Sequence, residues 1–161
     1  MQIRRATEED IEGIMELLVQ VCNVHAGGRP DLFVPNKRKY TEDELKALIK
    51  DPARPIFVAV DENRQEGTHE LLGHAFCELQ DLTSAPNMRQ DRELYLDDLC
   101  VNERCRGQHV GEHLWEAVCA YAREQGCYRV TLHVWSCNPK AEGFYEHLGL
   151  KPYLIGMEHI L

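Results

Sequence analysis

The chain has 161 residues, of which 43% are hydrophobic and 28% charged. These values suit one globular domain over residues 1–161 with a well-buried core and argue against a disordered chain. The formal net charge of -9 disfavours nucleic acid and anionic membrane surfaces as partners. Seven cysteines without a C-x-x-C pair, and the absence of an apolar run near ~18 residues, lead us to expect a reducing, cytoplasmic location.

The first third of the chain predicts one strand followed by two helices. A short strand is expected at Gln2–Arg5, and Thr7 then provides an N-cap hydroxyl for a helix with a regular apolar stripe. Thr41 begins a second helix with a capping box, and this helix stops before Pro52. Between the helices, residues 25–35 predict a loop that either packs over the core or closes over a substrate.

Three apolar segments in the middle of the chain predict an antiparallel meander. They are residues 56–60, 71–79 and 94–101, each with the composition of a strand. The polar residues 61–68 and the Pro-containing residues 81–91 are expected to be the connecting loops. Each strand should therefore pair with the next.

The following segments predict a parallel strand pair and two further helices. An amphipathic helix closed by Gly126 leads into residues 128–134, which alternate with period two. A strand, a helix and a strand of these lengths form a right-handed parallel unit. Asn138 and Pro139 then supply an N-cap and an N1 proline for a helix that runs to Gly149.

The last segment, residues 151–161, is expected to be extended, as one strand or as two joined at Gly156. The predicted order of elements is therefore β-α-α-β-β-β-α-β-α-β. It indicates an α/β fold in which a central mixed sheet is flanked by four helices.

The turn between the strand at residues 94–101 and the next helix has the features of an anion site. Unpaired amides and the helix dipole place partial positive charge at a helix start. Arg104 and Arg106 add charge, and Gly107 and Gly111 remove Cβ atoms that would block access to the backbone N–H groups. A pyrophosphate is the expected ligand.

Four motifs together resemble the GNAT N-acetyltransferase superfamily. They are Leu99-Cys100-Val101, Arg106-Gly107-Gln108-His109-Val110-Gly111, Asn138-Pro139-Lys140-Ala141 and Phe144-Tyr145-Glu146-His147-Leu148-Gly149-Leu150. The order of the predicted elements agrees with this family along nearly the whole chain. The resemblance implies a splayed sheet that binds acetyl-CoA, with no metal cofactor, and an enzyme of the acyltransferase class 2.3.1.

The resemblance also implies roles for individual residues. The backbone at Leu99 and Val101 would pair with the pantetheine amides, and Tyr145 would protonate the departing thiolate. The implied cofactor-binding set is Leu99, Cys100, Val101, Arg106, Gly107, Gln108, His109, Val110, Gly111, Asn138, Ala141 and Tyr145. The chain departs from the family at His109, where glycine is usual, and we expect a backbone there that does not need positive φ.

The general base is open among several residues. A lysine-like amine requires deprotonation at neutral pH, and Asp98 is our first candidate, with Glu78 acting through water as the alternative. Asp97, His74 and His133 are further candidates. Because neighbours in a strand point to opposite faces, Asp97 and Asp98 are not expected to face one pocket.

The sequence supports other kinds of site less well than the anion site. Cys105, His109 and His113 have a spacing of four, as metal ligands on a helix would, but the same loop suits phosphate better. Cys105 as an activated thiolate lacks an oriented His–acid pair. The sequence lacks the G-x-G-x-x-G and G-K-[ST] patterns that are typical of a nucleotide-binding fold.

The predicted function is transfer of an acetyl group from acetyl-CoA to a primary amine of a small molecule or peptide, by direct attack in a ternary complex. The alternative is a non-catalytic module that binds acyl-CoA or a nucleotide. A homodimer through the last strand is a further expectation from fold analogy.

Overall fold

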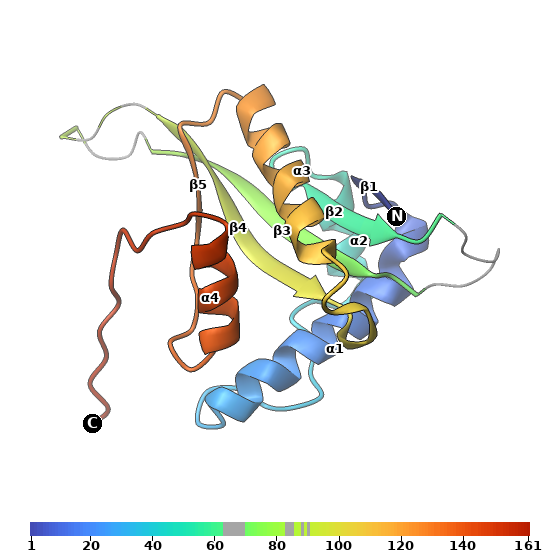
Figure 1. Cartoon of the computed structure of the whole chain (residues 1–161), viewed down its shortest axis with the longest axis horizontal. Coiled ribbons are helices and arrows are strands. Elements are labelled where there is room, and N and C mark those ends of the chain that lie inside the picture. The colour runs from blue at the N-terminus through green and yellow to red at the C-terminus, as the bar shows by residue number, and fades with distance from the viewer. Residues whose placement is uncertain (63–69, 83–85, 88, 90) are drawn as a thin grey trace.

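A computed structural model describes residues 1–62, 70–82, 86–87, 89 and 91–161 of the chain (Figure 1). Its strands are β1 (Gln2–Arg5), β2 (Ile56–Val60), β3 (Gly73–Asp81), β4 (Arg92–Val101) and β5 (Arg129–Leu132). Its helices are α1 (Ile11–Gly28), α2 (Glu42–Lys50), α3 (Val110–Glu124) and α4 (Pro139–His147), with short 3-10 turns at Glu8–Asp10 and Glu103–Cys105. The α/β class and the order of these elements are confirmed.

The strands form one mixed sheet in the order β1-β2-β3-β4-β5. The first four strands pair antiparallel with their neighbours, and β5 pairs parallel with β4 after the crossover through α3. The predicted meander and the predicted parallel unit are therefore both confirmed. Residues 63–68 of the first expected loop, and residues 83–85, 88 and 90 of the second, lie outside the described residues.

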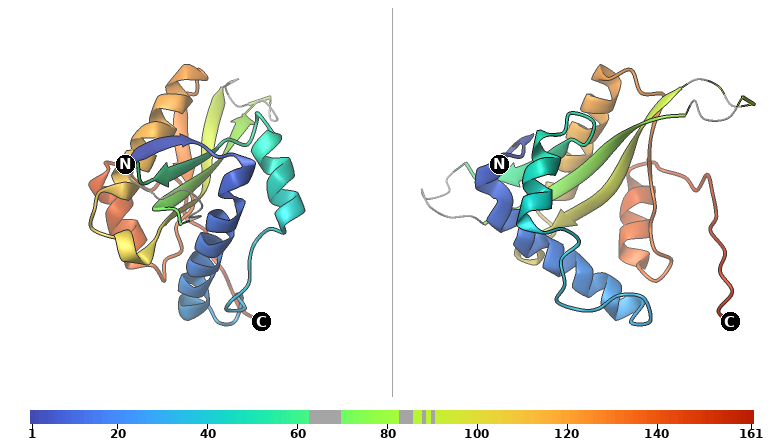
Figure 2. Two further views of the ribbon diagram at one scale, coloured as in Figure 1. Left: turned by 90° about the vertical axis from the view of Figure 1, so that its right-hand side faces the viewer. Right: turned by 180° about the vertical axis from the view of Figure 1, so that it is seen from behind.

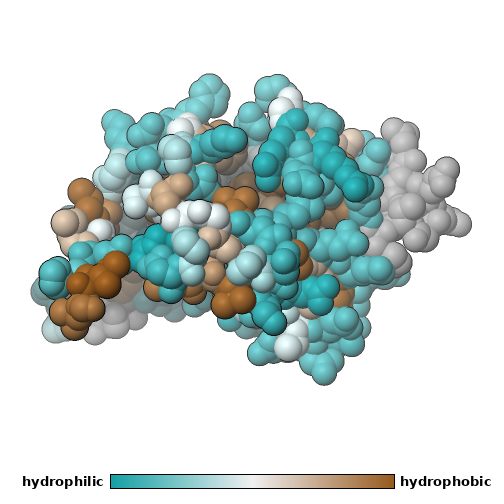
Figure 3. Space-filling model, turned by 90° about the horizontal axis from the view of Figure 1, so that it is seen from below, coloured by the Kyte–Doolittle hydropathy of each residue, from teal (hydrophilic) through white to brown (hydrophobic). Residues whose placement is uncertain are grey.

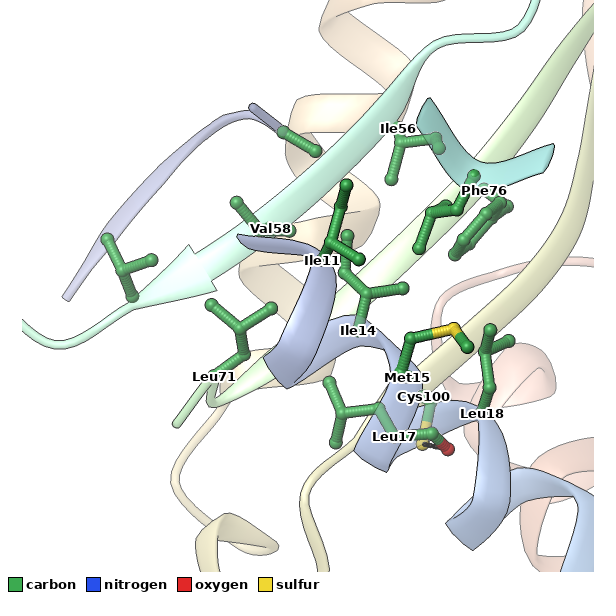
Figure 4. Close-up of a cluster of buried hydrophobic side chains, with 13 residues drawn as sticks. Ile11, Ile14, Met15, Leu17, Leu18, Ile56, Val58, Leu71, Phe76 and Cys100 are labelled. Carbon is green, nitrogen blue, oxygen red and sulfur yellow. Dashed lines mark hydrogen bonds between the residues drawn. The ribbon is translucent and has the colours of Figure 1, made fainter. Parts of the chain in front are cut away.

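Helices cover both faces of the sheet. α1 and α2 lie on one face, and α3 and α4 lie on the other (Figure 2). Figure 4 shows the core beneath α1, where Ile14, Leu17 and Leu18 pack against Val58 and Phe76 of the sheet. All five residues of β2 are buried, as expected for an apolar run in a strand covered on both sides.

A second core fills the space beneath α3. It contains Leu114 and Val118 of the helix together with Ala75, Leu94 and Leu96 of the sheet. The alternation of side chains along the strands divides them between the two cores. The sheet is thus a rigid platform, and the open end of β4 projects from it.

Two expectations about the elements are wrong. α1 continues to Gly28, so the first residues of the expected loop at 25–35 are helical. The expected last strand does not form, because among the described residues 148–161 none lies in a helix or a strand. Figure 1 shows this segment running away from α4 beside the domain. A strand was expected here, but within the described residues this segment has no strand to pair with.

Candidate active site

The sheet opens between β4 and β5. Their parallel pairing ends at Leu96 and Leu132, whereas β4 continues to Val101. From Asp97 onward, β4 therefore has no strand partner on its β5 side among the described residues. This gives one backbone edge that is free to pair with an extended ligand.

The direction of the β4 amides can be read from its pairing with β3. The Asn102 amide donates to the carbonyl oxygen of Leu72 at 2.9 Å, so this pair is hydrogen bonded. Because antiparallel pairs alternate between bonded and non-bonded, Cys100 also bonds to β3, while Leu99 and Val101 direct their amides toward the opening. The backbone amides of Leu99 and Val101 are thus available to pair with a ligand, as the resemblance implied. The backbone of Cys100 is already bonded to β3, and its side chain is buried beneath α1.

A β-bulge interrupts β4 where the opening begins. Phe76 of β3 lies opposite Asp98 of β4, but the next residue of β3 lies opposite Leu96. Asp97 is therefore the extra residue of the bulge. A bulge bends its strand and changes the direction of side chains, so the simple alternation assumed from the sequence does not hold here.

The bulge brings Asp97 and Asp98 to the same face of the sheet, which contradicts the sequence-based expectation. The Asp97 carboxylate accepts from the Tyr40 hydroxyl at 3.4 Å, and the Asp98 carboxylate lies 3.0 Å from Nε2 of His74. Tyr40 and His74 both pack against the ring of Phe76, on the α1 side. Two carboxylates therefore lie at the mouth of the opening.

Asp98 is held by a buried histidine. His74 is fully buried, and its Nδ1 has no hydrogen-bond partner among the described residues. The Asp98 side chain is only 13% exposed, so its interaction with Nε2 of His74 takes place with little solvent screening. Burial lowers the pKa of His25 in α1, an effect that the nearby charge of Asp98 partly opposes. His74 and Asp98 thus form a shielded pair on the α1 side of the opening.

Tyr145 reaches the same region from the other face. Asn138 caps α4 by accepting from the amide of Ala141 at 3.2 Å, as its sequence position predicted. Burial raises the pKa of Tyr145, and the nearby charge of Asp98 raises it further. The phenol therefore carries its proton at neutral pH. Asp98 and Tyr145 are near enough to interact electrostatically, although they come from separate elements.

The loop before α3 is a helix start with an unusual backbone. Gly107 and His109 both have positive φ, 77° and 60°. The expectation that His109 would avoid this conformation is wrong, and its left-handed backbone explains why glycine suits the position. Arg104 contacts Glu70 at 3.4 Å, and Arg106 is exposed beside the helix start. The loop thus retains positive charge and unpaired helix amides.

Gly111 also has a packing role, which the sequence did not indicate. A Cβ atom at this position would meet the ring of Phe144 at 2.9 Å. The missing side chain therefore allows α4 to pack closely on α3, and this contact sets the position of the residue after Phe144, which is Tyr145. Gly107 has open space around it, and its positive φ is the reason for glycine there.

The other candidate bases are placed less favourably. Glu78 lies 3.7 Å from Arg54 in an ion pair and is opposite Tyr95, on the part of β4 that β5 still covers. Nδ1 of His133 lies 3.1 Å from the Tyr95 hydroxyl at the end of β5. Asp98 is therefore better placed at the opening than Glu78 or His133.

The proposed metal ligands do not converge. His109 and His113 each contact a glutamate one turn along α3, at 3.1 and 3.3 Å. Within the described residues, no group of three or more His, Cys, Asp or Glu side chains has the arrangement of a metal site.

In the same part of the chain, no helix is both long enough and apolar enough to cross a membrane.

An aromatic group that the sequence did not predict borders the opening. His25 of α1, Phe33 of the following loop and Trp135 after β5 have ring centroids 5.1 to 6.4 Å apart. Phe33 therefore packs against the domain, which favours the packing interpretation of its loop. Trp135 lies three residues beyond the end of β5. Its place beside the opening could have been predicted only if the end of β5 had been known. Lys39 adds an ion pair with Asp97 at 2.6 Å.

Comparison with known proteins agrees with this arrangement. The family described as Acetyltransferase (GNAT) family matches residues 23–150. Thialysine N-epsilon-acetyltransferase of Sus scrofa is 35% identical over 60 residues, 37% of this chain and 35% of that protein. Glucosamine 6-phosphate N-acetyltransferase 1 of Oryza sativa subsp. japonica is 33% identical over 55 residues, 34% of this chain and 32% of that protein. The chain thus spans about a third of the length of these curated relatives.

Solved structures extend the likeness to the whole chain. A mutant form of the BH1408 protein from Bacillus halodurans has a TM-score of 0.91 and 29% identity, covering 100% of this chain and 99% of that one. An acetyltransferase of Trypanosoma brucei shares the fold, with a TM-score of 0.71 and 20% identity over 99% of both chains. Because the family match covers most of the sequence and the fold agrees, this protein belongs to the GNAT acetyltransferase family.

Proposed function

We propose that the protein transfers an acetyl group from acetyl-CoA to a primary amine of a small molecule or peptide. The observation that carries this proposal is the opening where β4 leaves β5, with the shielded carboxylate of Asp98 at its mouth and the Tyr145 phenol near enough for the Asp98 charge to raise its pKa. One group can accept a proton and the other can donate one. The proposed location of this reaction is the cytoplasm.

The opening fits the chemistry of acetyl-CoA. The outward amides of Leu99 and Val101 suit the carbonyl groups of a pantetheine arm, because an extended chain can pair with a free strand edge. The helix start at Val110 and the guanidinium of Arg106 suit a pyrophosphate. We also assign Gly107, Gln108, His109 and Gly111 to this loop, and Asn138 and Ala141 to the neighbouring helix start.

When bound, acetyl-CoA supplies an activated acyl group on a good leaving thiolate. Asp98 would attract the protonated amine and accept its proton at a carboxylate oxygen, which leaves the nitrogen nucleophilic. Tyr145 would hold its proton on the phenol oxygen for the departing sulfur. Burial and the Asp98 charge raise the pKa of Tyr145, which supports this protonated state at neutral pH.

The mouth of the opening favours a cationic acceptor. Asp97 and Asp98 lie on one face, and among the described residues a lysine pairs with Asp97 but not with Asp98. The rings of Phe33 and Trp135 offer an apolar wall for the carbon skeleton of the amine. Relatives named for acetylation of thialysine and glucosamine 6-phosphate support an amine acceptor in general. Glu78 acting through water is retained as the alternative base.

Release of the coenzyme A thiol from acetyl-CoA with a panel of primary amines tests the proposed reaction. We expect amine-dependent thiol release and recovery of the acetylated amine. The alternative is a regulatory module that binds acyl-CoA without turnover. Saturable acetyl-CoA binding by calorimetry, combined with no thiol release for any amine in the panel, would favour the module.

Replacement of Tyr145 by Phe tests the acid. The substitution removes the hydroxyl and retains the ring, so acetyl-CoA affinity should persist while turnover falls by ~10²–10⁴. Turnover that is unchanged across the pH range would falsify the role assigned to Tyr145.

A further inference from the structure

His74 is a fully buried titratable side chain that no step of the proposed reaction uses. The face of the molecule seen in Figure 3 is mostly hydrophilic, and titratable groups at such a surface are in contact with water. The His74 side chain has no exposed surface, although its Nε2 lies 3.0 Å from the carboxylate of the proposed base Asp98. A buried imidazole with an unpaired nitrogen calls for a structural or a chemical reason.

The register of the strands places His74 beside Asp98. His74 of β3 lies opposite Cys100 of β4, and Phe76 lies opposite Asp98. His74 and Asp98 are therefore diagonal neighbours across the two strands. Residues two apart in a strand point to the same face, and Phe76 and Cys100 both belong to the core beneath α1 (Figure 4). The imidazole thus approaches the Asp98 carboxylate from the core side.

Neighbouring groups hold the imidazole ring in place. Its centroid lies 4.9 Å from that of Phe76, and the two rings are nearly perpendicular, at 81°. On the other side of β3, Val58 of β2 is opposite His74 and is itself fully buried. Cys100 is held in turn, because its thiol donates to the carbonyl oxygen of Leu17 at 3.6 Å. Close packing confines such side chains to few rotamers, so His74 is a rigid point of attachment.

The two ring nitrogens of His74 have different surroundings. Nε2 lies 3.0 Å from Oδ2 of Asp98, whereas Nδ1 is buried and has no hydrogen-bond partner among the described residues. A proton on Nδ1 alone would leave a buried donor unpaired and would turn the Nε2 lone pair toward a carboxylate oxygen. Nε2 therefore carries a proton and donates it in a hydrogen bond to Asp98.

This hydrogen bond determines how the Asp98 carboxylate is directed. It engages Oδ2, so Oδ1 is the oxygen left for an acceptor amine. The torsion that rotates an aspartate carboxylate is soft, and a fixed donor on one oxygen restricts it. A displacement of ~1 Å at a reacting group can lower a rate by ~10²-fold. The direction of Oδ1 thus has a large influence on proton removal.

We propose that His74 is a positioning residue of the acetyl transfer, whose Nε2–H holds Oδ2 of Asp98 and directs Oδ1 toward the amine. The amine loses its proton to Oδ1, and the Nε2 proton stays on His74. His74 is not the base itself, because its ring has no exposed surface at which an amine could meet it. This inference rests on the proposed function, in which Asp98 is the base.

A double-mutant cycle with Asp98→Asn tests the assignment in the thiol-release assay. His74→Leu removes the donor, so kcat/KM for a strongly basic amine should fall by ~10–10²-fold. In the Asp98→Asn background no base remains to be positioned, and the same substitution should cost less than about threefold. His74→Gln can place an amide donor near the position of Nε2, so its rate should stay within about fivefold of wild type.

The basicity of the acceptor distinguishes positioning from a general loss of structure. An amine whose pKa lies below the assay pH is already neutral and needs no base, so its rate in His74→Leu should stay within about threefold of wild type. Val58→Ala serves for comparison, because it removes buried volume directly opposite His74. It should lower the thermal stability and change the rates of weakly and strongly basic amines by the same factor.

Nitrogen NMR of the wild-type imidazole tests the geometry without any turnover. We expect His74 to carry a proton on Nε2, and a ring protonated on Nδ1 alone would overturn the assignment. Equal losses from His74→Leu in the wild-type and Asp98→Asn backgrounds, or with both classes of amine, would also overturn it while the proposed function stands. A wild-type chain that releases no thiol with any amine would instead overturn the proposed function, and the role of His74 with it.

Discussion

Asp98 is the residue on which the proposed chemistry depends most. It lies at the bulge of β4, its carboxylate is 3.0 Å from Nε2 of His74, and its charge raises the pKa of Tyr145. A carboxylate that is mostly shielded from water interacts strongly with an ammonium group that enters beside it. At this position, the Asp98 carboxylate can both attract the cationic acceptor and remove a proton from it.

Replacement of Asp98 by Asn should lower kcat/KM at neutral pH by ~10²–10⁴, the usual contribution of a general base. The remaining rate should rise about tenfold per pH unit, because only the neutral amine reacts and a lysine-like amine has a pKa of ~10.4. Initial rates of thiol release between pH 6 and pH 9 measure both effects.

Glu78→Gln is the matched control for this prediction. It removes the same charge from the neighbouring strand, but Glu78 is tied to Arg54, so its rate should change by less than about threefold. If Glu78→Gln lost the activity and Asp98→Asn kept it, the base would be Glu78 acting through water.

His109→Gly should stabilise the protein without loss of acetyl-CoA affinity. His109 has a φ of 60°, which costs an L-residue roughly 1–2 kcal/mol, while glycine loses ~0.5–1 kcal/mol of this gain through the greater entropy of its unfolded chain. Urea unfolding should therefore show a gain of about 0.5–1 kcal/mol in the free energy of unfolding. Calorimetry with acetyl-CoA should show equal or tighter binding.

His109→Ala separates the two contributions, since it removes the imidazole but keeps the strained backbone. A large loss of acetyl-CoA affinity in both variants would show that the imidazole binds the cofactor directly.

At the residue scale, the sequence predicted which residues lie at the site better than it predicted where their amides and side chains point. The outward amides of Leu99 and Val101 agree with the motif, because strand alternation is regular there. The shared face of Asp97 and Asp98 was not predictable, since a bulge depends on how β4 pairs with β3 and not on its own residues. The positive φ of His109 was missed for a similar reason, because a histidine gives no local signal for it.

At the element scale, the packing of α4 on α3 sets the position of Tyr145. The ring of Phe144 occupies the space where Gly111 would carry a Cβ atom. The two helices are far apart in sequence, so this contact could not be deduced from either helix alone. The sequence indicated only the anion-site role of Gly111, which remains a proposal beside this packing role.

Gly111→Ala should reduce stability by about 1–3 kcal/mol, as overpacking of a filled interface does, and should also reduce turnover by shifting Tyr145. Gly143→Ala is the matched control in α4, because nothing lies within 4 Å of the Cβ that it would add. That variant should be stabilised by ~0.5–1 kcal/mol through helix propensity. Thermal unfolding and thiol release measure the two effects, and equal behaviour of both variants would contradict the packing role.

Residues 151–161 illustrate the limit of a prediction from local sequence. A strand was expected there, but within the described residues no strand pairs with this segment. Local sequence can specify an extended conformation, whereas pairing requires an edge that lies within reach.

At the scale of the whole molecule, the sheet divides the chain into a rigid part and an open part. β1 to β4 form a continuous antiparallel platform between two cores, and β5 closes only the first half of β4. The four sequence motifs, together with the predicted order of elements, were sufficient to identify the family. The width and lining of the opening depended on tertiary contacts, such as that between Phe33 and Trp135, which the order alone does not contain.

Hydrogen exchange along β4, with and without acetyl-CoA, tests most directly whether the opening binds the cofactor. We predict that saturating acetyl-CoA slows exchange at Leu99 and Val101, whose amides face the opening, while Cys100 between them is already slow through its bond to β3 and does not change. Unchanged exchange at Leu99 and Val101 under saturating acetyl-CoA would contradict the account.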